Sequence, residues 1–297
     1  MVKNKILLID GTYLAYRSYY ATMYATFNGQ AIQTSKGFPT NAIVGFFNSF
    51  FSLIKTVDPE FIFFAFDSRK KTFRHELFTE YKGNRQKAPV DFHKQLEKIQ
   101  ELLTSCKFAN EYVDGFEADD IIAKLTTKFQ NDHQILIYSA DQDLNQLINE
   151  NVAIIKKYKS ENIILNLNNF NEYYDFKPRQ VIDYKALVGD SSDNFKGVPG
   201  LGPKTVSGLL KEFDTLENIY QNLDNIRPKV KEKLIDYKQD AQRDKYLATL
   251  RTDFEIKTND LSNLKLSNMQ LTNETFKILD DLELNEIKNK LISLEIF

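Results

Sequence analysis

Cysteine, histidine and tryptophan are scarce in this 297-residue sequence, which has one cysteine, three histidines and no tryptophan. A single cysteine, Cys106, excludes an internal disulfide and a cysteine-based zinc cluster, and is typical of a reducing compartment. The histidines lack the close helical spacing of a zinc-binding pair, so no histidine-built metal site is expected. We interpret Cys106 as a small core residue.

Long hydrophobic runs are also missing. The most apolar long stretch, residues 42–54, is interrupted by polar residues and is too short to cross a bilayer. Residues 1–10 lack the length and the cleavage site of a secretory signal. We therefore expect a cytoplasmic protein that does not contact membranes.

A charge excess of either sign is absent, because 39 basic and 41 acidic residues give a net charge of −2. Taken alone, this balance argues weakly against a nucleic-acid partner. Nine acidic residues, however, form a candidate metal site. With those nine neutralised, 39 basic residues would face 32 acidic ones, and the resulting net charge of +7 suits a polyanionic partner.

Apolar runs rich in β-forming residues recur at 6–9, 61–66 and 135–138, with helical patterns such as residues 41–57 between them. This alternation predicts an α/β fold with a parallel central sheet flanked by helices. After an expected edge strand at 163–167, the pattern changes to short helices. We predict an α/β catalytic domain over residues 1–170 and a helical C-terminal domain over residues 171–297.

Acidic residues gather at the ends of the predicted strands and in three later clusters. The nine candidates are Asp10, Asp67, Glu117, Asp119, Asp120, Asp141, Asp143, Asp190 and Asp193. Each acid taken alone is better explained as a helix cap, a turn former or a solvated charge than as a metal ligand. Because the carboxyl ends of parallel strands share one edge of a sheet, however, Asp10, Asp67 and Asp141 are expected to converge there.

So many carboxylates cannot stay ionised close together without compensating positive charge, because neighbouring like charges raise one another's pKa. Oxygen ligands select hard cations such as Mg²⁺ or Mn²⁺. Two such ions, about 3.5–4 Å apart, are a common arrangement for phosphodiester hydrolysis. The acids therefore predict a site for two or more divalent cations.

Residues 68–89 form the most basic and aromatic segment of the chain. Its basic residues are interleaved with Phe73, Phe78 and Tyr81. A solvated surface helix with long basic side chains remains an alternative. The position between two acidic strand ends favours an element that grips DNA.

A glycine- and proline-rich turn occupies residues 197–205. Its exposed amides, around Gly200 and Gly202, are expected to hold a DNA phosphate without reading bases, with added charge from Lys204. A helix-turn-helix corner whose glycines are purely structural is the alternative at this point.

Seven motifs, in this order, resemble those of the 5′-nuclease domain of bacterial DNA polymerase I, in the flap endonuclease superfamily. They are LLIDG (7–11), FAFD (64–67), FRHE (73–76), YKGNR (81–85), FEADD (116–120), ADQDL (140–144) and GDSSDN (189–194). The resemblance continues through residues 197–210, which are similar to the family's helix-three-turn-helix, expected here at about 185–212.

The resemblance implies roles for these residues. The nine carboxylates would be metal ligands or their close supports, and Arg74 and Lys82 would be catalytic residues on a helical arch at about 68–90. The hairpin would hold duplex DNA, often with a bound K⁺. The implied DNA-binding residues are Phe73, Arg74, Tyr81, Lys82, Arg85, Gly200, Gly202, Lys204 and Thr205.

The implied activity is a monomeric, structure-specific 5′-3′ exonuclease and flap endonuclease that leaves 5′-phosphates. Its partners would be 5′-flap, gapped or branched DNA and single-stranded 5′ ends, in primer removal and repair at the nucleoid. Two alternatives remain: a non-catalytic protein that binds branched DNA, and a relative that cuts RNA, since two-metal chemistry does not require deoxyribose.

Overall fold

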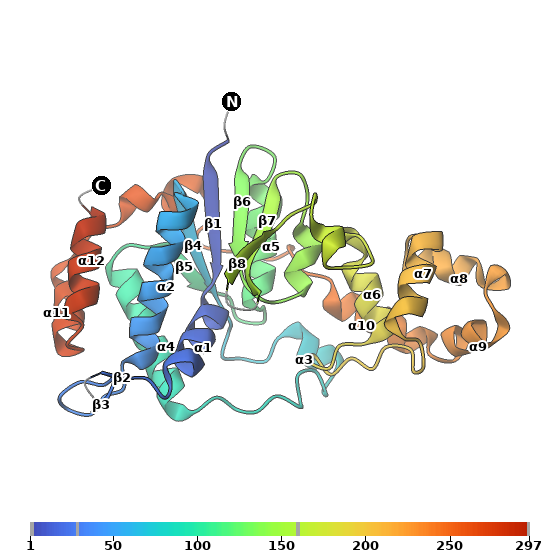
Figure 1. Cartoon of the computed structure of the whole chain (residues 1–297), viewed down its shortest axis with the longest axis horizontal. Coiled ribbons are helices and arrows are strands. Elements are labelled where there is room, and N and C mark those ends of the chain that lie inside the picture. The colour runs from blue at the N-terminus through green and yellow to red at the C-terminus, as the bar shows by residue number, and fades with distance from the viewer. Residues whose placement is uncertain (1–2, 28–29, 159–160, 296–297) are drawn as a thin grey trace.

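The computed structural model describes residues 3–27, 30–158 and 161–295 (Figure 1). The central feature of this part of the chain is a six-stranded sheet, mostly parallel, with one antiparallel edge strand. Across the sheet, the strands are β5 (Asn110–Tyr112), β4 (Phe61–Phe66), β1 (Lys5–Asp10), β6 (Gln134–Tyr138), β7 (Val152–Tyr158) and β8 (Glu161–Leu165). A separate pair consists of β2 (Thr26–Phe27) and β3 (Gln30–Ala31).

The predicted α/β fold is confirmed. Strands β4, β1 and β6 are the three predicted from apolar runs, and they are neighbours at the centre of the sheet. The expected edge strand is also present, two residues earlier than predicted, as β8 paired antiparallel to β7. Strands β5 and β7 were not predicted.

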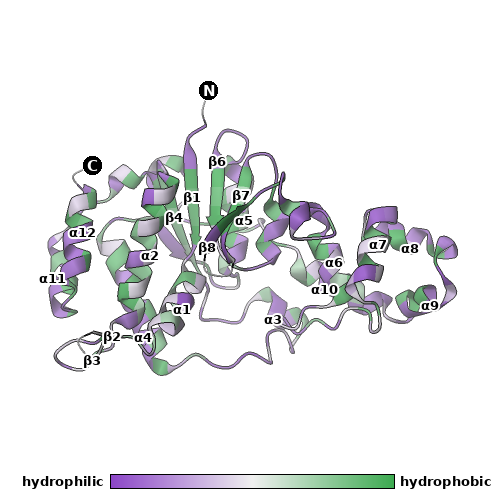
Figure 2. Cartoon of the chain, viewed as in Figure 1, coloured by the Kyte–Doolittle hydropathy of each residue, from purple (hydrophilic) through white to green (hydrophobic). Residues whose placement is uncertain are grey.

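Burial on both faces explains why β4 is an uninterrupted apolar run. All six of its residues are buried. Ile62, Phe64 and Phe66 belong to the core on one face, whereas Phe61 and Phe63 belong to the core on the other. Each buried phenylalanine contributes roughly 1.5–3 kcal/mol relative to an exposed side chain. The sheet is therefore a rigid support for the residues at its ends, and Figure 2 shows its inner strands β1, β4 and β6 as largely hydrophobic.

Helices cover the two faces of the sheet unequally. On one face, the core includes residues from α1 (Gly11–Thr22), α2 (Asn41–Val57), α4 (Val90–Ser105), α11 (Asn273–Asp281) and α12 (Asn285–Glu295). The other face packs against α5 (Ala118–Phe129). Short 3₁₀ turns occur in the connecting segments: η1 (Asp143–Leu147), η2 (Phe170–Glu172), η3 (Pro178–Gln180), η4 (Leu223–Asn225), η5 (Leu261–Leu264) and η6 (Leu266–Asn268).

A smaller helical region lies beside the sheet, with α7, α8 and α9 at the end of the molecule (Figure 1). It comprises α6 (Val181–Val188), α7 (Pro203–Phe213), α8 (Leu216–Gln221), α9 (Pro228–Asp236) and α10 (Lys238–Ala248). Its own core contains Leu187, Val198, Leu210 and Leu234. The glycine-rich hairpin lies in the chain that joins α6 to α7.

The chain after the helical region returns to the α/β body. Leu279, Leu284 and Leu291, from α11, the turn after it and α12, are buried in the same core as α2 and α4. An antiparallel bridge between Lys265 and Phe61 fastens this tail to the sheet. None of the helices described combines the length and apolarity needed to traverse a bilayer.

Candidate active site

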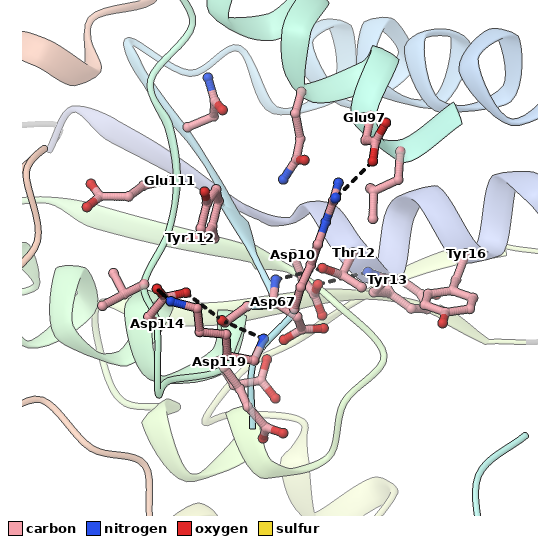
Figure 3. Close-up of a pocket in the computed structure, with 18 of the residues that line it drawn as sticks. Asp10, Thr12, Tyr13, Tyr16, Asp67, Glu97, Glu111, Tyr112, Asp114 and Asp119 are labelled. Atoms are coloured by element: carbon pink, nitrogen blue, oxygen red, sulfur yellow. Dashed lines mark hydrogen bonds and ion pairs between the residues drawn. The ribbon is translucent and has the colours of Figure 1, made fainter. Parts of the chain in front are cut away.

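Three of the predicted acids meet at one edge of the sheet. Asp10 is the last residue of β1, Asp67 follows β4, and Asp141 follows β6. Because these strands are parallel neighbours, their carboxyl ends lie side by side. Asp119, in the first turn of α5, joins them. All four line one cavity of about 1670 Å³, and Figure 3 shows Asp10, Asp67 and Asp119 close together within it.

Short hydrogen bonds fix the direction of these carboxylates. Asp10 is the N-cap of α1 and accepts from the Tyr13 amide at 2.9 Å, while the Ser139 hydroxyl donates to its other oxygen at 2.9 Å. The Ala118 amide donates to Asp67 at 2.9 Å. Asp119 differs, because its Oδ1 atom is buried and has no hydrogen-bond partner among the described residues. An unpaired buried carboxylate oxygen is costly, so it calls for a cation or a proton.

Burial and mutual repulsion raise the pKa of these acids. Burial, then the charge of Asp67, raises the pKa of Asp10 to about 7. Burial and the nearby Glu117 raise the pKa of Asp67. Burial, followed by the charges of Asp141 and Asp10, holds the pKa of Asp119 well above its usual range. At neutral pH the cavity therefore favours bound positive charge.

The donor chemistry fits a hard divalent cation, since every candidate ligand is a carboxylate oxygen. Among the described residues, no three acidic, histidine or cysteine side chains are positioned to hold an ion as they stand. A bound cation would therefore have to draw the cavity carboxylates closer together. The Asp119 Oδ1 atom, which has no hydrogen-bond partner among the described residues, would gain a bond to the cation in this movement.

The structure does not bring Asp120 and Arg74 into this cavity. Arg74 is 2% exposed and donates to both oxygens of Asp120, at 2.6 and 2.8 Å. The amides of Glu117 and Arg251 also donate to Asp120, at 3.1 and 2.9 Å. Arg74 also donates to two backbone carbonyls, from Nε to Leu247 at 2.8 Å and from Nη2 to Thr249 at 3.4 Å. The sequence predicted Asp120 to be a metal ligand or its close support, and Arg74 to be a catalytic residue that contacts DNA. In the structure the two form a buried ion pair outside the cavity.

Glu117 lies at the cavity wall and is held by two residues predicted to touch DNA. The Tyr81 hydroxyl donates to Glu117 at 2.9 Å, and the Lys82 ammonium lies 2.7 Å from its other oxygen. Burial alone would raise the pKa of Glu117, but the charges of Lys82 and Arg74 outweigh it and lower the pKa to about 2. Lys82 lines the cavity, whereas Tyr81 is 3% exposed and is buried.

The last three acids form a neighbouring group beside the cavity. Lys185 bridges two of them, pairing with Asp143 and lying 2.6 Å from Asp190. The third, Asp193, pairs with Arg85 at 3.1 Å. Burial raises the pKa of Asp143 to about 7 even though the Lys185 charge opposes it.

Sequence reasoning missed Lys185. It is 5% exposed on α6, and burial alone would lower its pKa. The charges of Asp143 and Asp141 outweigh burial and raise that pKa, so the lysine stays charged. One signal was available in the sequence, because Lys185 is a lone basic residue in the apolar helix just before the acidic pair.

The expected helical arch has a different conformation here. Within residues 68–89, only α3 (Phe73–Leu77) is helical, and turns or extended chain make up the rest. Lys82 has a left-handed φ of 53°, which interrupts a helix, and its amide donates to the Asp193 carbonyl at 3.2 Å. Asn84 and Arg85 bond to the carbonyls of Ser191 and Ser192 at 2.6 and 2.9 Å. The segment is thereby tied to the 190–193 loop.

Phe73 is only partly exposed, because two guanidinium groups lie against it. Arg74 and Arg251 are 4.5 and 5.2 Å from its ring centre. Of the basic residues predicted to touch DNA in this segment, Lys82 and Arg85 line the cavity. They are therefore the ones placed to meet a phosphate there.

The hairpin is a separate surface in the helical region. Gly200, Gly202, Lys204 and Thr205 are all exposed. In the described part of the chain, the amides of Gly200, Gly202 and Lys204 have no hydrogen-bond acceptor. A left-handed φ of 79° at Gly200 favours glycine there.

An α/β body with clustered acids at its parallel strand ends and a helical region beside it indicates the class of nucleases. Two family models match in succession. Residues 5–175 match the 5′-3′ exonuclease N-terminal resolvase-like domain, and residues 176–272 match the 5′-3′ exonuclease C-terminal SAM fold. The chain belongs to the 5′-3′ exonuclease family.

Curated relatives include both short and long proteins. The chain is 39% identical over 257 residues to a 5′-3′ exonuclease of Mycoplasmopsis pulmonis, covering 86% of this chain and 83% of that protein. It is 36% identical over 294 residues to a 5′-3′ exonuclease of Aquifex aeolicus, covering 98% and 92%. DNA polymerase I of Bacillus subtilis is 36% identical over 293 residues, 97% of this chain. The chain spans only 32% of the length of that polymerase.

Solved structures share the fold. A T5 protein co-crystallised with metal ions aligns with a TM-score of 0.70 at 22% identity, covering 93% of this chain and 99% of that one. A bacteriophage T5 flap endonuclease in a complex with DNA and metal ions aligns with a TM-score of 0.69 at 19% identity, covering 99% and 100%. These likenesses confirm the mostly parallel α/β architecture with its helical addition.

Proposed function

We propose that this protein is a structure-specific 5′-3′ exonuclease and flap endonuclease that hydrolyses DNA phosphodiester bonds with two divalent cations, Mg²⁺ or Mn²⁺, and leaves 5′-phosphates. The observation that carries the proposal is the meeting of Asp10, Asp67, Asp119 and Asp141 in one cavity. Family membership and the metal- and DNA-bound T5 structures of the same fold support it.

Each residue group has a distinct part in this proposal. The four cavity acids would hold the cations, with Glu117 at the wall and Asp143, Asp190 and Asp193 as a neighbouring acidic group. When bound, the cations would activate water and stabilise the leaving oxygen. Lys82 and Arg85 would meet the scissile phosphate, because both line the cavity and each carries donors suited to a phosphate. Asp120 would support the site through its pair with Arg74.

The proposed substrates are 5′-flap, gapped and branched duplexes and single-stranded 5′ ends, in RNA-primer removal and DNA repair. The hairpin would hold the duplex through its free amides and Lys204. The family resemblance implied a K⁺ ion at the hairpin. The proposed function does not include this ion, because the Lys233 ammonium already bonds to the Gly200 carbonyl.

Cleavage of a labelled 5′-flap duplex tests the proposal. Product that appears with Mg²⁺ and disappears with a chelator is expected, and matched RNA and DNA flaps would reveal any preference for one. Binding of the flap without any metal-dependent product would instead favour the non-catalytic DNA-binding alternative.

Replacing Lys204 by alanine should weaken duplex binding by removing one phosphate contact. In a plot of log affinity against log salt, the slope should become shallower by about 0.9, the value for one phosphate on duplex DNA. Fluorescence anisotropy over a salt series measures this slope. Lys211, at the opposite end of α7, gives the control variant Lys211→Ala. Equal slopes for wild type and Lys204→Ala would remove this lysine from the DNA interface.

A further inference from the structure

The ammonium group of a lysine lies against the hairpin between α6 and α7. Lys233, on α9, reaches across to the exposed Gly200, and its Nζ atom lies 3.0 Å from the Gly200 carbonyl oxygen. The approach is close enough that a Cβ atom added to Gly200 would lie 2.1 Å from Nζ. The ammonium group of Lys233 therefore lies directly over the turn.

Lys233, more than the turn itself, closes the hairpin carbonyls to a monovalent metal ion, because a carbonyl oxygen that accepts one hydrogen bond keeps a second lone pair. The Val198 carbonyl accepts from the Leu201 amide at 3.0 Å, and the Gly202 carbonyl accepts from the amides of Thr205 and Val206 at 3.0 and 3.1 Å. At the Gly200 carbonyl, a metal ion would lie against the Lys233 ammonium, and like charges repel at such short range. The donor set therefore does not fit K⁺ while Lys233 is in place.

The charge of Lys233 is not neutralised within the described residues. Lys231, on the same helix, pairs with Asp224 at 2.6 Å. Lys233 makes no such ion pair in the described part of the chain; its one hydrogen bond there is to Gly200. An ammonium has three donors, so two remain for an anion or water. These donors lie at the same turn as the free amides of Gly200 and Gly202, where an anion would find both charge and hydrogen bonds.

We propose that the Lys233 ammonium takes the place of a monovalent metal ion at the hairpin, orienting the Gly200 peptide and adding the positive charge that a DNA backbone phosphate needs. This inference rests on the proposed DNA-binding function. It makes duplex binding indifferent to the identity of the monovalent salt, and it makes Lys233 a DNA-binding residue.

The test is duplex binding by fluorescence anisotropy in EDTA, in KCl, NaCl or LiCl of equal concentration. Wild type should bind equally in all three salts. Lys233→Met keeps the side-chain length and loses the charge, and should weaken binding about eightfold at ~0.1 M NaCl, the effect of one lost phosphate contact. With the carbonyl freed, that variant should also bind more tightly in KCl than in LiCl.

Lys231→Met is the matched control, because it removes the same charge from the same helix without touching the hairpin. It should bind within about twofold of wild type, and thermal melts should show both variants folded. Tighter wild-type binding in KCl than in LiCl, or equal affinities for the two variants, would overturn the inference. Absence of wild-type binding in every salt would instead refute the proposed function itself.

Discussion

Replacing Asp119 by asparagine should abolish flap cleavage while making the metal-free protein more stable. The substitution keeps the shape of the side chain but removes a charge that is buried with an unpaired oxygen and repelled by Asp141 and Asp10. We expect cleavage to fall by about a thousandfold or more. In EDTA, the free energy of unfolding should rise by about 1 kcal/mol, as is common when a strained functional site is relieved.

Two measurements check this prediction: cleavage of a labelled flap in Mg²⁺, and thermal melts with and without Mg²⁺. Wild type should gain stability from the cation, by about 2.7 kcal/mol at a hundred times its dissociation constant, and Asp119→Asn should gain much less. Asp114→Asn is the control, since Asp114 lines the same cavity but is exposed and paired with Lys70. Its cleavage rate should stay within a few fold of wild type. Wild-type cleavage by Asp119→Asn would contradict the proposed metal site.

Replacing Arg74 by methionine should destabilise the whole fold. The change leaves Asp120 as a fully buried carboxylate without its partner, which costs about 3–5 kcal/mol. For a chain of this size, the melting temperature should fall by roughly 10 °C. Adding Asp120→Leu to the same protein should recover most of the loss, because no buried charge then remains.

Arg69→Met supplies the comparison for this effect. Arg69 pairs with Glu97 at 2.8 Å, but the two side chains are 65% and 47% exposed, so the loss should stay below about 1 kcal/mol. Chemical denaturation of the three variants measures these differences. If Arg74→Met were as stable as Arg69→Met yet lost DNA binding, the original interpretation of Arg74 as a DNA contact would be correct.

The convergence of the acids was predictable because it follows from topology alone. Asp10, Asp67 and Asp141 each follow an apolar run, and parallel strands put such residues at one edge. The hairpin was predictable for a similar reason, since its glycines and prolines permit few local conformations. In both cases the local sequence pattern is distinctive, and for the acids a general rule of parallel sheets supplies the rest.

Features that depend on distant partners could not be predicted. Arg74 and Asp120 look like surface charges until Leu247 and Arg251, more than a hundred residues later, close over them. Strand β7 was missed because its two lysines follow a short apolar run, and only pairing with β6 shows that the run is central. The tail after residue 253 has no motif of its own, and its short apolar segments acquire a role only when they pack on the sheet. Phe254, Ile256 and Leu264 join the core with α5, and Leu279, Leu284 and Leu291 join the core with α2 and α4.

The central claim is that acids far apart in the chain bind divalent cations together. Anomalous diffraction from crystals soaked in Mn²⁺ tests this directly, because it locates the metal without reference to activity. We predict peaks between Asp10, Asp67, Asp119 and Asp141, with the Asp119 Oδ1 atom as a ligand. A map with no peak in this cavity, or with manganese bound only at other surfaces, would contradict the account.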